Sequence, residues 1–176
     1  MELIKVKSAS DALLKRVPEL YEEAFPPEER TDTSHFVAMV GRCPQMDFNA
    51  IVDDGEFCGM AVIWNLGICR YLLYLAVLRD RRNKGYGAQT LHLLQSESDL
   101  PVIAEVELPI EPIKVRRIKF YERNGFHVEL ANPQILNASH SDPRCRLQLI
   151  SNQILPNADE CQRRVVDVVY RSLHNC

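Results

Sequence analysis

The feature that most constrains this chain is an apolar run that stops abruptly at a basic turn containing two glycines. Residues 71–78 are almost entirely apolar and are typical of a buried strand. The turn at residues 79–87 is followed by a helical pattern, so the order is strand, turn and helix. Such a turn exposes backbone N–H groups at the positive end of a helix dipole, where phosphate groups bind. The sequence therefore predicts a phosphate cradle, formed by the backbone of residues 83–88, for the pyrophosphate of a nucleotide-containing cofactor.

Length, composition and charge predict one globular domain. The 176 residues are 46% hydrophobic and 26% charged, which is enough apolar material for a substantial core. The longest mostly apolar stretch without a charge, residues 57–69, is shorter than the ~20 residues of a membrane-spanning helix. The first seven residues contain no signal-peptide pattern, so we expect a cytoplasmic protein with no membrane partner. A net charge of −3 argues against general nucleic-acid binding, which needs a basic surface.

The cysteines and histidines form no pattern of a disulfide framework or a metal site. No two of the six cysteines have C-x-x-C spacing, and three fall in or beside strand-like runs. This favours buried thiols over disulfides. The five histidines are scattered, and no pair has the spacing of metal ligands. We therefore expect neither a metal ion nor a nucleophilic cysteine.

Periodicity in the first half predicts a strand, two helices and an antiparallel meander of three strands. Pro18 is expected to kink or divide the first helix. The second helix is expected to be capped by Thr31 or Thr33. The Asp-Gly pair in the turn at 53–56 is the strongest hairpin signal in the chain. The predicted elements are a strand at 1–7, a helix capped at 8–11 and ended by 25–30, a short helix near 36–40, and strands at 48–52, 57–64 and 71–78.

The second half continues with a strand–helix–strand unit, whose two strands must be parallel because a helix crosses over between them. That unit consists of the strand 71–78, a helix at 85–97 and a strand at 102–108. The remaining predicted elements are a helix at 112–124, a strand at 126–130, a polar loop at 131–143, a strand at 144–151 paired with the previous one, and an amphipathic helix at 157–174.

Two familiar phosphate-binding motifs do not fit the turn. A P-loop requires G-x-x-x-x-G-K-[ST], which residues 85–90 lack. A dinucleotide-binding fingerprint requires a third glycine where Thr90 stands. It also lies at the first strand of a parallel sheet, whereas here a meander precedes it. A third class of cradle is therefore needed.

Two separate motifs resemble those of the GNAT superfamily of N-acetyltransferases. Residues 82–87 match the acyl-CoA motif R/Q-x-x-G-x-G/A, and residues 120–126 resemble the F/L-Y-x-x-x-G-F that follows the last helix of that fold. The resemblance covers residues 1–151. It implies an α/β (α+β) fold with a mixed, mostly antiparallel sheet, a central splayed parallel pair of strands, and helices on both faces. Residues 152–176 would be a C-terminal helical extension, packed either on the same domain or on the partner in a homodimer.

The resemblance also implies an activity, which is transfer of an acetyl group from acetyl-CoA to a primary amine in a direct ternary complex. The acceptor would be a small molecule or a peptide. Glycines at 85 and 87 would let the backbone approach the pyrophosphate, while strand 71–78 would bind pantetheine and direct an amide at the acetyl carbonyl. The expected acyl-CoA-binding residues are Leu75, Ala76, Val77, Arg82, Asn83, Lys84, Gly85, Tyr86, Gly87 and Ala88.

Three side chains are candidates for proton transfer. Tyr121 occupies the position where the family often has its general acid, or it packs on the cofactor without a proton role. Glu105 and Glu107 share one face of their strand, so either could remove a proton from the acceptor amine. They could instead face solvent or pair with Arg116 or Arg117.

The acceptor side carries weaker signals. Glu22, Glu23, Glu28 and Glu29 cluster in the segment that covers the acceptor pocket in the family, where they either attract a cationic amine or form a solvated face. The sequence also departs from the family at Lys114, because many members have an asparagine there that contacts pantetheine. A non-catalytic acyl-CoA-binding regulatory module on the same fold is the alternative to an enzyme.

Overall fold

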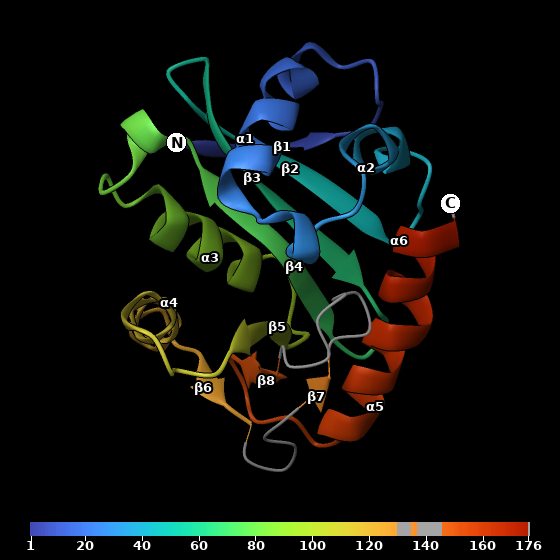
Figure 1. Ribbon diagram of the computed structural model, residues 1–176, viewed down its shortest axis with the longest axis vertical. Helices are drawn as coiled ribbons and strands as arrows, with labels where there is room; N and C mark the ends of the chain where they lie inside the picture. The colour runs from blue at the N-terminus through green and yellow to red at the C-terminus, as the bar shows by residue number, and fades with distance from the viewer. Residues whose placement is uncertain (130–134, 137–145, 176) are drawn as a thin grey trace.

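The computed structural model describes residues 1–129, 135–136 and 146–175, which form one mixed β-sheet with helices on both faces (Figure 1). The strands are β1 (Glu2–Val6), β2 (Met46–Asp53), β3 (Glu56–Asn65), β4 (Arg70–Val77), β5 (Val102–Glu107), β6 (His127–Val128), β7 (Ile135–Leu136) and β8 (Arg146–Ser151). Their order across the sheet is β1-β2-β3-β4-β5-β8-β6, and β7 pairs with β8. Only the β4–β5 pair is parallel among the described strand pairs. This confirms the predicted mixed sheet with a central parallel pair.

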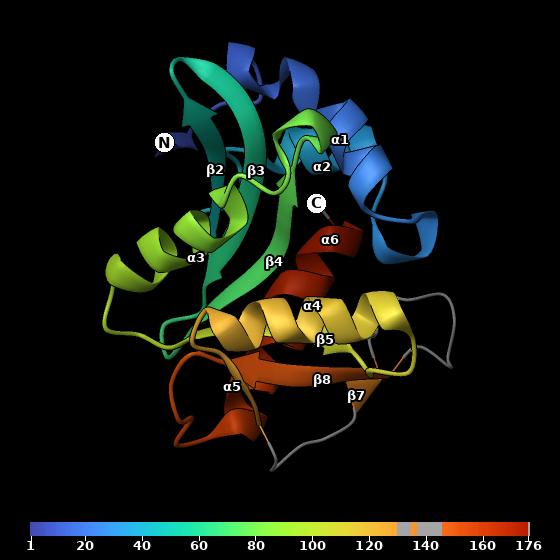
Figure 2. The same cartoon turned by 90° about the vertical axis from the view of Figure 1, so that its left-hand side faces the viewer.

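The helices divide between the two faces of this sheet, and each face has its own hydrophobic cluster (Figures 1 and 2). One face is covered by α1 (Val17–Ala24), α2 (Thr33–Met39) and a C-terminal helix. The other face is covered by α3 (Tyr86–Ser96) and α4 (Pro112–Arg123). The C-terminal helix consists of α5 (Ala158–Arg164), a π-helical turn (Val165–Tyr170) and α6 (Arg171–Asn175), and short 3-10 helices occupy Ala12–Arg16, Pro27–Glu29 and Arg79–Arg81.

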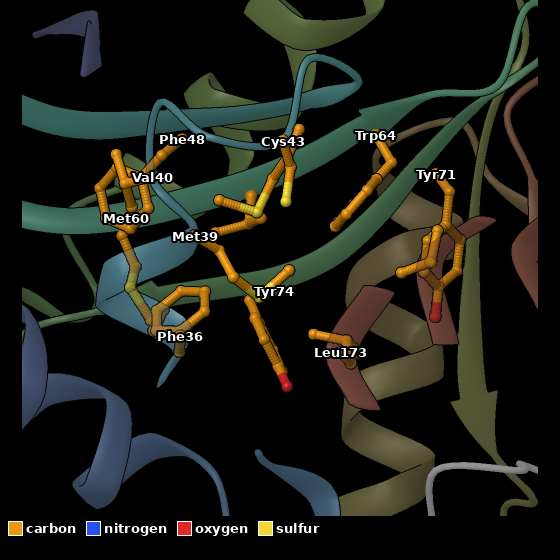
Figure 3. Packing of buried hydrophobic residues seen from close by; sticks show 14 of the residues in the cluster. Phe36, Met39, Val40, Cys43, Phe48, Met60, Trp64, Tyr71, Tyr74 and Leu173 are labelled. Carbon is orange, nitrogen blue, oxygen red and sulfur yellow. The ribbon is translucent and has the colours of Figure 1, made fainter. Parts of the chain in front are cut away.

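The core on the first face is rich in aromatic side chains. Tyr21 stacks on Phe36 with ring centroids 4.3 Å apart, and the ring of Tyr74 meets Tyr21 edge-on at 5.1 Å. Leu173 of α6 belongs to the same cluster, as Figure 3 shows. Because the C-terminal helix contributes to this core, it packs against the sheet of its own chain.

The β2–β3 hairpin forms where the sequence predicts it. Asp54 and Gly55 make a two-residue turn with φ values of 51° and 78°. Two successive positive φ values match the twist of antiparallel strands and favour Asp-Gly. Asp53 consequently lies opposite Glu56 in the ladder.

The parallel strands β4 and β5 pair over only two positions and then diverge (Figure 2). Arg70 pairs with Val102 and Tyr71 with Ile103, and no later pair is formed. On its other edge, β4 has a bulge where it pairs with β3. Successive residues of β3 pair with Tyr74 and Leu72, so Leu73 is an extra residue in β4. The divergence frees one edge of β4 from residue 72 onward.

Several local predictions need correction or lie outside the described residues. Helix α2 is capped by Asp32, whose side chain accepts a hydrogen bond from the N–H of His35 at 3.0 Å, and not by either neighbouring threonine. Strand β6 covers His127–Val128 and begins one residue later than predicted, because the N–H of Phe126 bonds to the carbonyl of Tyr121 at the end of α4. The last predicted residue of this strand, 130, lies outside the described residues. Strand β7 falls within the predicted loop 131–143, whose other residues lie outside the described part of the chain.

Two further observations concern the chain as a whole. Within the described residues, no helix combines the length and apolar character needed to cross a membrane. The four described cysteines, Cys43, Cys58, Cys69 and Cys161, are buried, and Cys58, Cys69 and Cys161 carry free thiols.

Candidate active site

A cavity of about 680 Å³ lies where β4 and β5 diverge. It extends from the turn after β4 to the C-terminal helix, and its walls come from the α1–α2 connection, β4, the start of α3, β5, α4 and the C-terminal helix. The predicted residues that line it are Leu75, Val77, Arg82, Asn83, Gly85, Tyr86, Gly87, Ala88, Glu105, Glu107 and Tyr121.

The phosphate cradle at residues 83–88 has the backbone geometry of an anion site. Gly85 caps α3 with a φ of +84°, a left-handed conformation that a side chain disfavours. No hydrogen bond in the described chain uses the N–H groups of Asn83, Lys84 or Gly85. The first N–H groups of α3 also lack partners within the helix. A Cβ on Gly87 would lie 3.2 Å from the ring of Phe120, so this glycine allows α3 and α4 to approach closely.

Three predicted residues of the cradle region have side chains that point elsewhere. Ala76 is buried in the opposite core, and Lys84 is exposed outside the cavity lining. The Tyr86 ring is also buried, and its hydroxyl donates to Asp53 at 2.7 Å, so this side chain anchors the cradle to the β2–β3 hairpin. Only the backbone of Tyr86 therefore remains available to a phosphate.

The basic residues of the turn differ in how strongly they are already paired. The Arg82 guanidinium donates to the carbonyl of Val77 at 3.0 Å and pairs with Glu23 at 2.9 Å, which ties the turn to α1. Arg81 lines the cavity and lies 3.7 Å from the exposed Asp80. Arg123 adds a further cation to the cavity lining from α4.

Tyr121 lies on α4 and lines the cavity. Its ring meets Phe120 and Phe126 edge-on, with centroids 5.3 Å and 5.4 Å away, respectively. Burial raises the pKa of the Tyr121 hydroxyl to about 12. The hydroxyl is therefore protonated at neutral pH, and it has no hydrogen-bond partner among the described residues.

Glu105 lies in the middle of β5 with its carboxylate in the cavity wall. Its Oε2 accepts hydrogen bonds from the hydroxyls of Tyr71, at 3.0 Å, and of Tyr170. Its Oε1 is shielded from solvent and has no partner among the described residues. Burial raises the pKa of Glu105, and the two hydroxyls act in the opposite direction.

Glu107 has different surroundings, although it lies on the same strand face. Its carboxylate pairs with Lys114 at 3.0 Å and with Arg117 at 3.1 Å. Of the alternatives left open for the two glutamates, pairing with Arg117 is the one observed for Glu107. Lys114, which replaces the family's asparagine, also pairs with Glu111 at 2.9 Å. Two cations therefore hold Glu107, while Glu105 keeps a free oxygen.

The acidic cluster near the acceptor side is partly neutralised. Glu22 accepts a hydrogen bond from Thr33 at 2.6 Å and lies 3.9 Å from Arg30, and Glu23 pairs with Arg82. Glu29 lines the cavity, and its carbonyl accepts a hydrogen bond from Tyr74 at 3.3 Å. The side chain of Glu28 is outside the described part of the structure.

Sequence reasoning missed the aromatic residues at this end of the cavity. Tyr71 and Tyr74 are three residues apart, and in an unbroken strand they would point to opposite faces. The bulge at Leu73 places both against the same core. Tyr170 lies outside the predicted apolar stripe of its helix and reaches the cavity through the π-helical turn. Neither the bulge nor the π-helical turn has a signal in the sequence.

Comparison with known proteins now identifies the fold. The family model for a GNAT acetyltransferase domain matches residues 44–128, whereas no curated protein matches significantly. A putative GNAT acetyltransferase from Bacteroides thetaiotaomicron has a similar structure, with a TM-score of 0.85 and 27% identity over 97% of this chain and 98% of that one. The sequence motifs, the diverging strand pair and these matches all indicate the same fold, that of the GNAT acetyltransferases.

Two more distant structures share the fold. An aminoglycoside 6′-N-acetyltransferase complexed with coenzyme A has a TM-score of 0.66 and 19% identity over 90% of this chain and all of that one. Arabidopsis thaliana Naa50, in complex with the bisubstrate analogue CoA-Ac-MVNAL, has a TM-score of 0.59 and 16% identity over 88% of this chain and all of that one. These two likenesses show the shared fold alone. The match of residues 44–128 to the GNAT acetyltransferase domain and the similarity to the Bacteroides thetaiotaomicron structure agree with the family predicted from the two motifs.

Proposed function

We propose that the protein transfers an acetyl group from acetyl-CoA to a primary amine of a small molecule or peptide, in a direct ternary complex. One observation carries the proposal. A single cavity is lined by the phosphate cradle, by Tyr121 with its neutral hydroxyl and by Glu105. These are the groups needed to hold the donor, protonate the leaving sulfur and deprotonate the amine.

The cradle and β4 supply what acetyl-CoA needs for binding. The N–H groups around Gly85 and the helix N-terminus of α3 provide donors for the pyrophosphate, and Arg81 and Arg123 provide positive charge. Beyond Tyr71, β4 presents an edge without a partner strand. An extended pantetheine arm can add to that edge as peptides add to sheet edges. The chain's residues therefore fit this donor.

Tyr121 acts at the sulfur in this proposal. A hydroxyl with a pKa of about 12 keeps its proton at neutral pH and can donate it to the sulfur as the carbon–sulfur bond breaks. Thiols have a pKa of about 8.5 in water, and the apolar rings of Phe120 and Phe126 disfavour a thiolate beside them. The same surroundings that keep Tyr121 neutral thus make proton transfer to the sulfur easier.

Glu105 acts at the amine. An alkylamine has a pKa of about 10, so it arrives protonated and must lose a proton before it attacks the carbonyl carbon. Glu105 lines the cavity and can take that proton, and the raised pKa of this carboxylate improves the match to an amine. Glu107, held by Lys114 and Arg117, is the weaker candidate because its charge is already compensated.

The class of acceptor is supported by likeness in fold and by the cavity. Proteins of similar structure include an aminoglycoside N-acetyltransferase and a protein bound to a peptide-containing bisubstrate analogue. Here the acceptor end combines a carboxylate with the rings of Phe25, Tyr71 and Tyr74. That combination suits an ammonium group carried on a partly apolar body. The buried free thiols of Cys58, Cys69 and Cys161 agree with a reducing compartment, and we propose the cytoplasm as the site of the reaction.

The direct test is release of free thiol from acetyl-CoA in the presence of candidate acceptors. The panel contains aminoglycosides, peptides with a free N-terminus and small diamines, with an acceptor-free reaction as background. We expect at least one amine class to release thiol well above background and to gain an acetyl group by mass. If acetyl-CoA raises the unfolding temperature while no acceptor releases thiol, the result supports an acyl-CoA-binding module instead.

A further inference from the structure

We propose that Tyr170, in the π-helical turn near the C-terminus, is a positioning residue that works with Tyr71 to hold the carboxylate of Glu105 in place for the acceptor amine. The inference rests on the proposed function and deepens it. It makes the C-terminal helix part of the active site, although this helix lies outside the segment 44–128 that matches the family model.

The first support is the asymmetry of the Glu105 carboxylate. Oε2 receives both hydroxyls, one from a strand 34 residues away in sequence and the other from a helix 65 residues away. Oε1 receives none and is shielded from solvent. A carboxylate bound twice on one oxygen cannot rotate freely, so the side chain of Glu105 is held in one orientation.

The second support is the rigidity of the helix that carries Tyr170. Val165 and Val169, in the same π-helical turn, are fully buried, and Tyr170 itself is 2% exposed. Below it, the backbone carbonyl of Leu173 accepts a hydrogen bond from the hydroxyl of Thr31 at 3.3 Å. The helix is thus attached both to the sheet and to the α1–α2 connection, which lines the cavity at its acceptor end.

The third support is the π-helical turn itself. A π-helical turn inserts an extra residue into the helix and rotates the following side chains by ~100° relative to a continuous α-helix. Here the turn ends at Tyr170, which lines the cavity together with Leu173. Such turns carry a cost in backbone packing and are frequent at functional sites.

The charged and titratable groups around Glu105 are few in the described structure. From β4 it faces Tyr71, and from the C-terminal helix it faces Tyr170, which is itself near Tyr74. Along β5 the next ionisable group on its face is Glu107, whose charge is compensated by α4. Removing one hydroxyl should therefore favour the protonated form of Glu105, with no nearby cation to offset the change.

The experiment compares Tyr170→Phe with Ser172→Ala in the full-length enzyme. Ser172 lies on the same helix, its hydroxyl bonds to the carbonyl of Val168 at 2.6 Å, and it does not line the cavity. For Tyr170→Phe we expect kcat/KM for the acceptor to fall about ten- to a hundredfold at neutral pH. The acidic limb of its pH profile should move to higher pH, while acetyl-CoA affinity stays unchanged. Ser172→Ala should leave the profile in place.

A second readout needs no activity. The infrared band of the protonated Glu105 carboxyl, identified by its loss in Glu105→Gln, reports the titration of this group in the free protein. It should appear at higher pH in Tyr170→Phe, and also in Tyr71→Phe, which removes the other donor and replaces Tyr170→Phe should that variant fail to fold. Identical titration in wild type and variant overturns the inference. Absence of any acetyl transfer by the wild type overturns the proposed function and leaves the infrared result to decide on Tyr170.

Discussion

The donor end of the cavity is built mainly from backbone, whereas the acceptor end is built from side chains. At the donor end, one continuous segment from Leu75 to Ala88 supplies a strand edge, a left-handed glycine and a helix N-terminus. At the acceptor end, Tyr71, Glu105 and Tyr170 converge from two strands and the C-terminal helix. The difference suggests that donor binding tolerates many side-chain changes, while acceptor chemistry depends on a few hydroxyl and carboxyl groups.

The largest effect is expected at the donor end, from a change that disturbs the backbone. Gly85→Asp forces a side chain onto a φ of +84° and adds a negative charge where phosphate should bind. We expect detectable acetyl-CoA binding to be lost in titration calorimetry. Gly55→Asp is the matched control, because Gly55 has a φ of +78° in an open hairpin turn and does not line the cavity. Retained affinity in Gly85→Asp would contradict the cradle assignment.

Next in size is the effect of removing the proposed acid. Tyr121→Phe keeps the ring and its contacts with Phe120 and Phe126 and removes only the hydroxyl. We expect kcat to fall by roughly 10²–10⁴, the range for lost proton transfer. Acetyl-CoA affinity should change little. Unaltered turnover in a steady-state assay would leave Tyr121 with a packing role only.

The two glutamates of β5 differ in their surroundings, so matched substitutions can compare their roles at the acceptor end. Glu105→Gln should lower kcat by roughly 10²–10³, because the amine loses its base. Glu107→Gln should lower it less than about tenfold, because that carboxylate only compensates Lys114 and Arg117 at a partly exposed site. Equal losses in the two variants would show that the free oxygen of Glu105 has no special role.

The smallest effect is a change in stability with pH. Burial raises the pKa of Glu105 in the folded protein, so folding favours its protonated form. Its contribution to stability is present below the unfolded pKa and is lost as pH rises through the folded pKa. Glu105→Gln should therefore unfold a few degrees higher than wild type at neutral pH and at nearly the same temperature in acid. A variant less stable than wild type at neutral pH would contradict this sign.

The different construction of the two ends also explains what the sequence could predict. The turn that we propose as the cradle was predictable because its left-handed backbone requires a glycine after an apolar strand, and Gly85 and Gly87 are visible in the sequence. The β2–β3 hairpin was predictable for the same reason, since its Asp-Gly turn requires two positive φ values. A backbone conformation that only certain residues can adopt is therefore visible in the local sequence.

The acceptor end was less predictable because its geometry depends on irregularities in regular elements. Alternation places Tyr71 and Tyr74 on opposite faces, and only the bulge at Leu73 brings them together. Helical periodicity omits Tyr170 from the buried stripe, and only the π-helical turn directs it to Glu105. Both irregularities depend on packing between distant segments. Strand alternation predicted Glu105 as a candidate site residue, but it did not predict that Tyr71 and Tyr170 are its hydrogen-bond partners.

The distance in sequence between Glu105 and Tyr170 has a consequence for how the site is assembled during synthesis. Chains emerge from the ribosome N-terminus first, at ≈ 5–20 residues per second. The cradle segment and β5 are therefore made before the residue that completes the acceptor end, which follows Glu105 by 65 positions. A nascent chain could hold a donor before it can use an acceptor. In the proposed mechanism the acceptor end is then completed last, once the C-terminal helix that carries Tyr170 has docked.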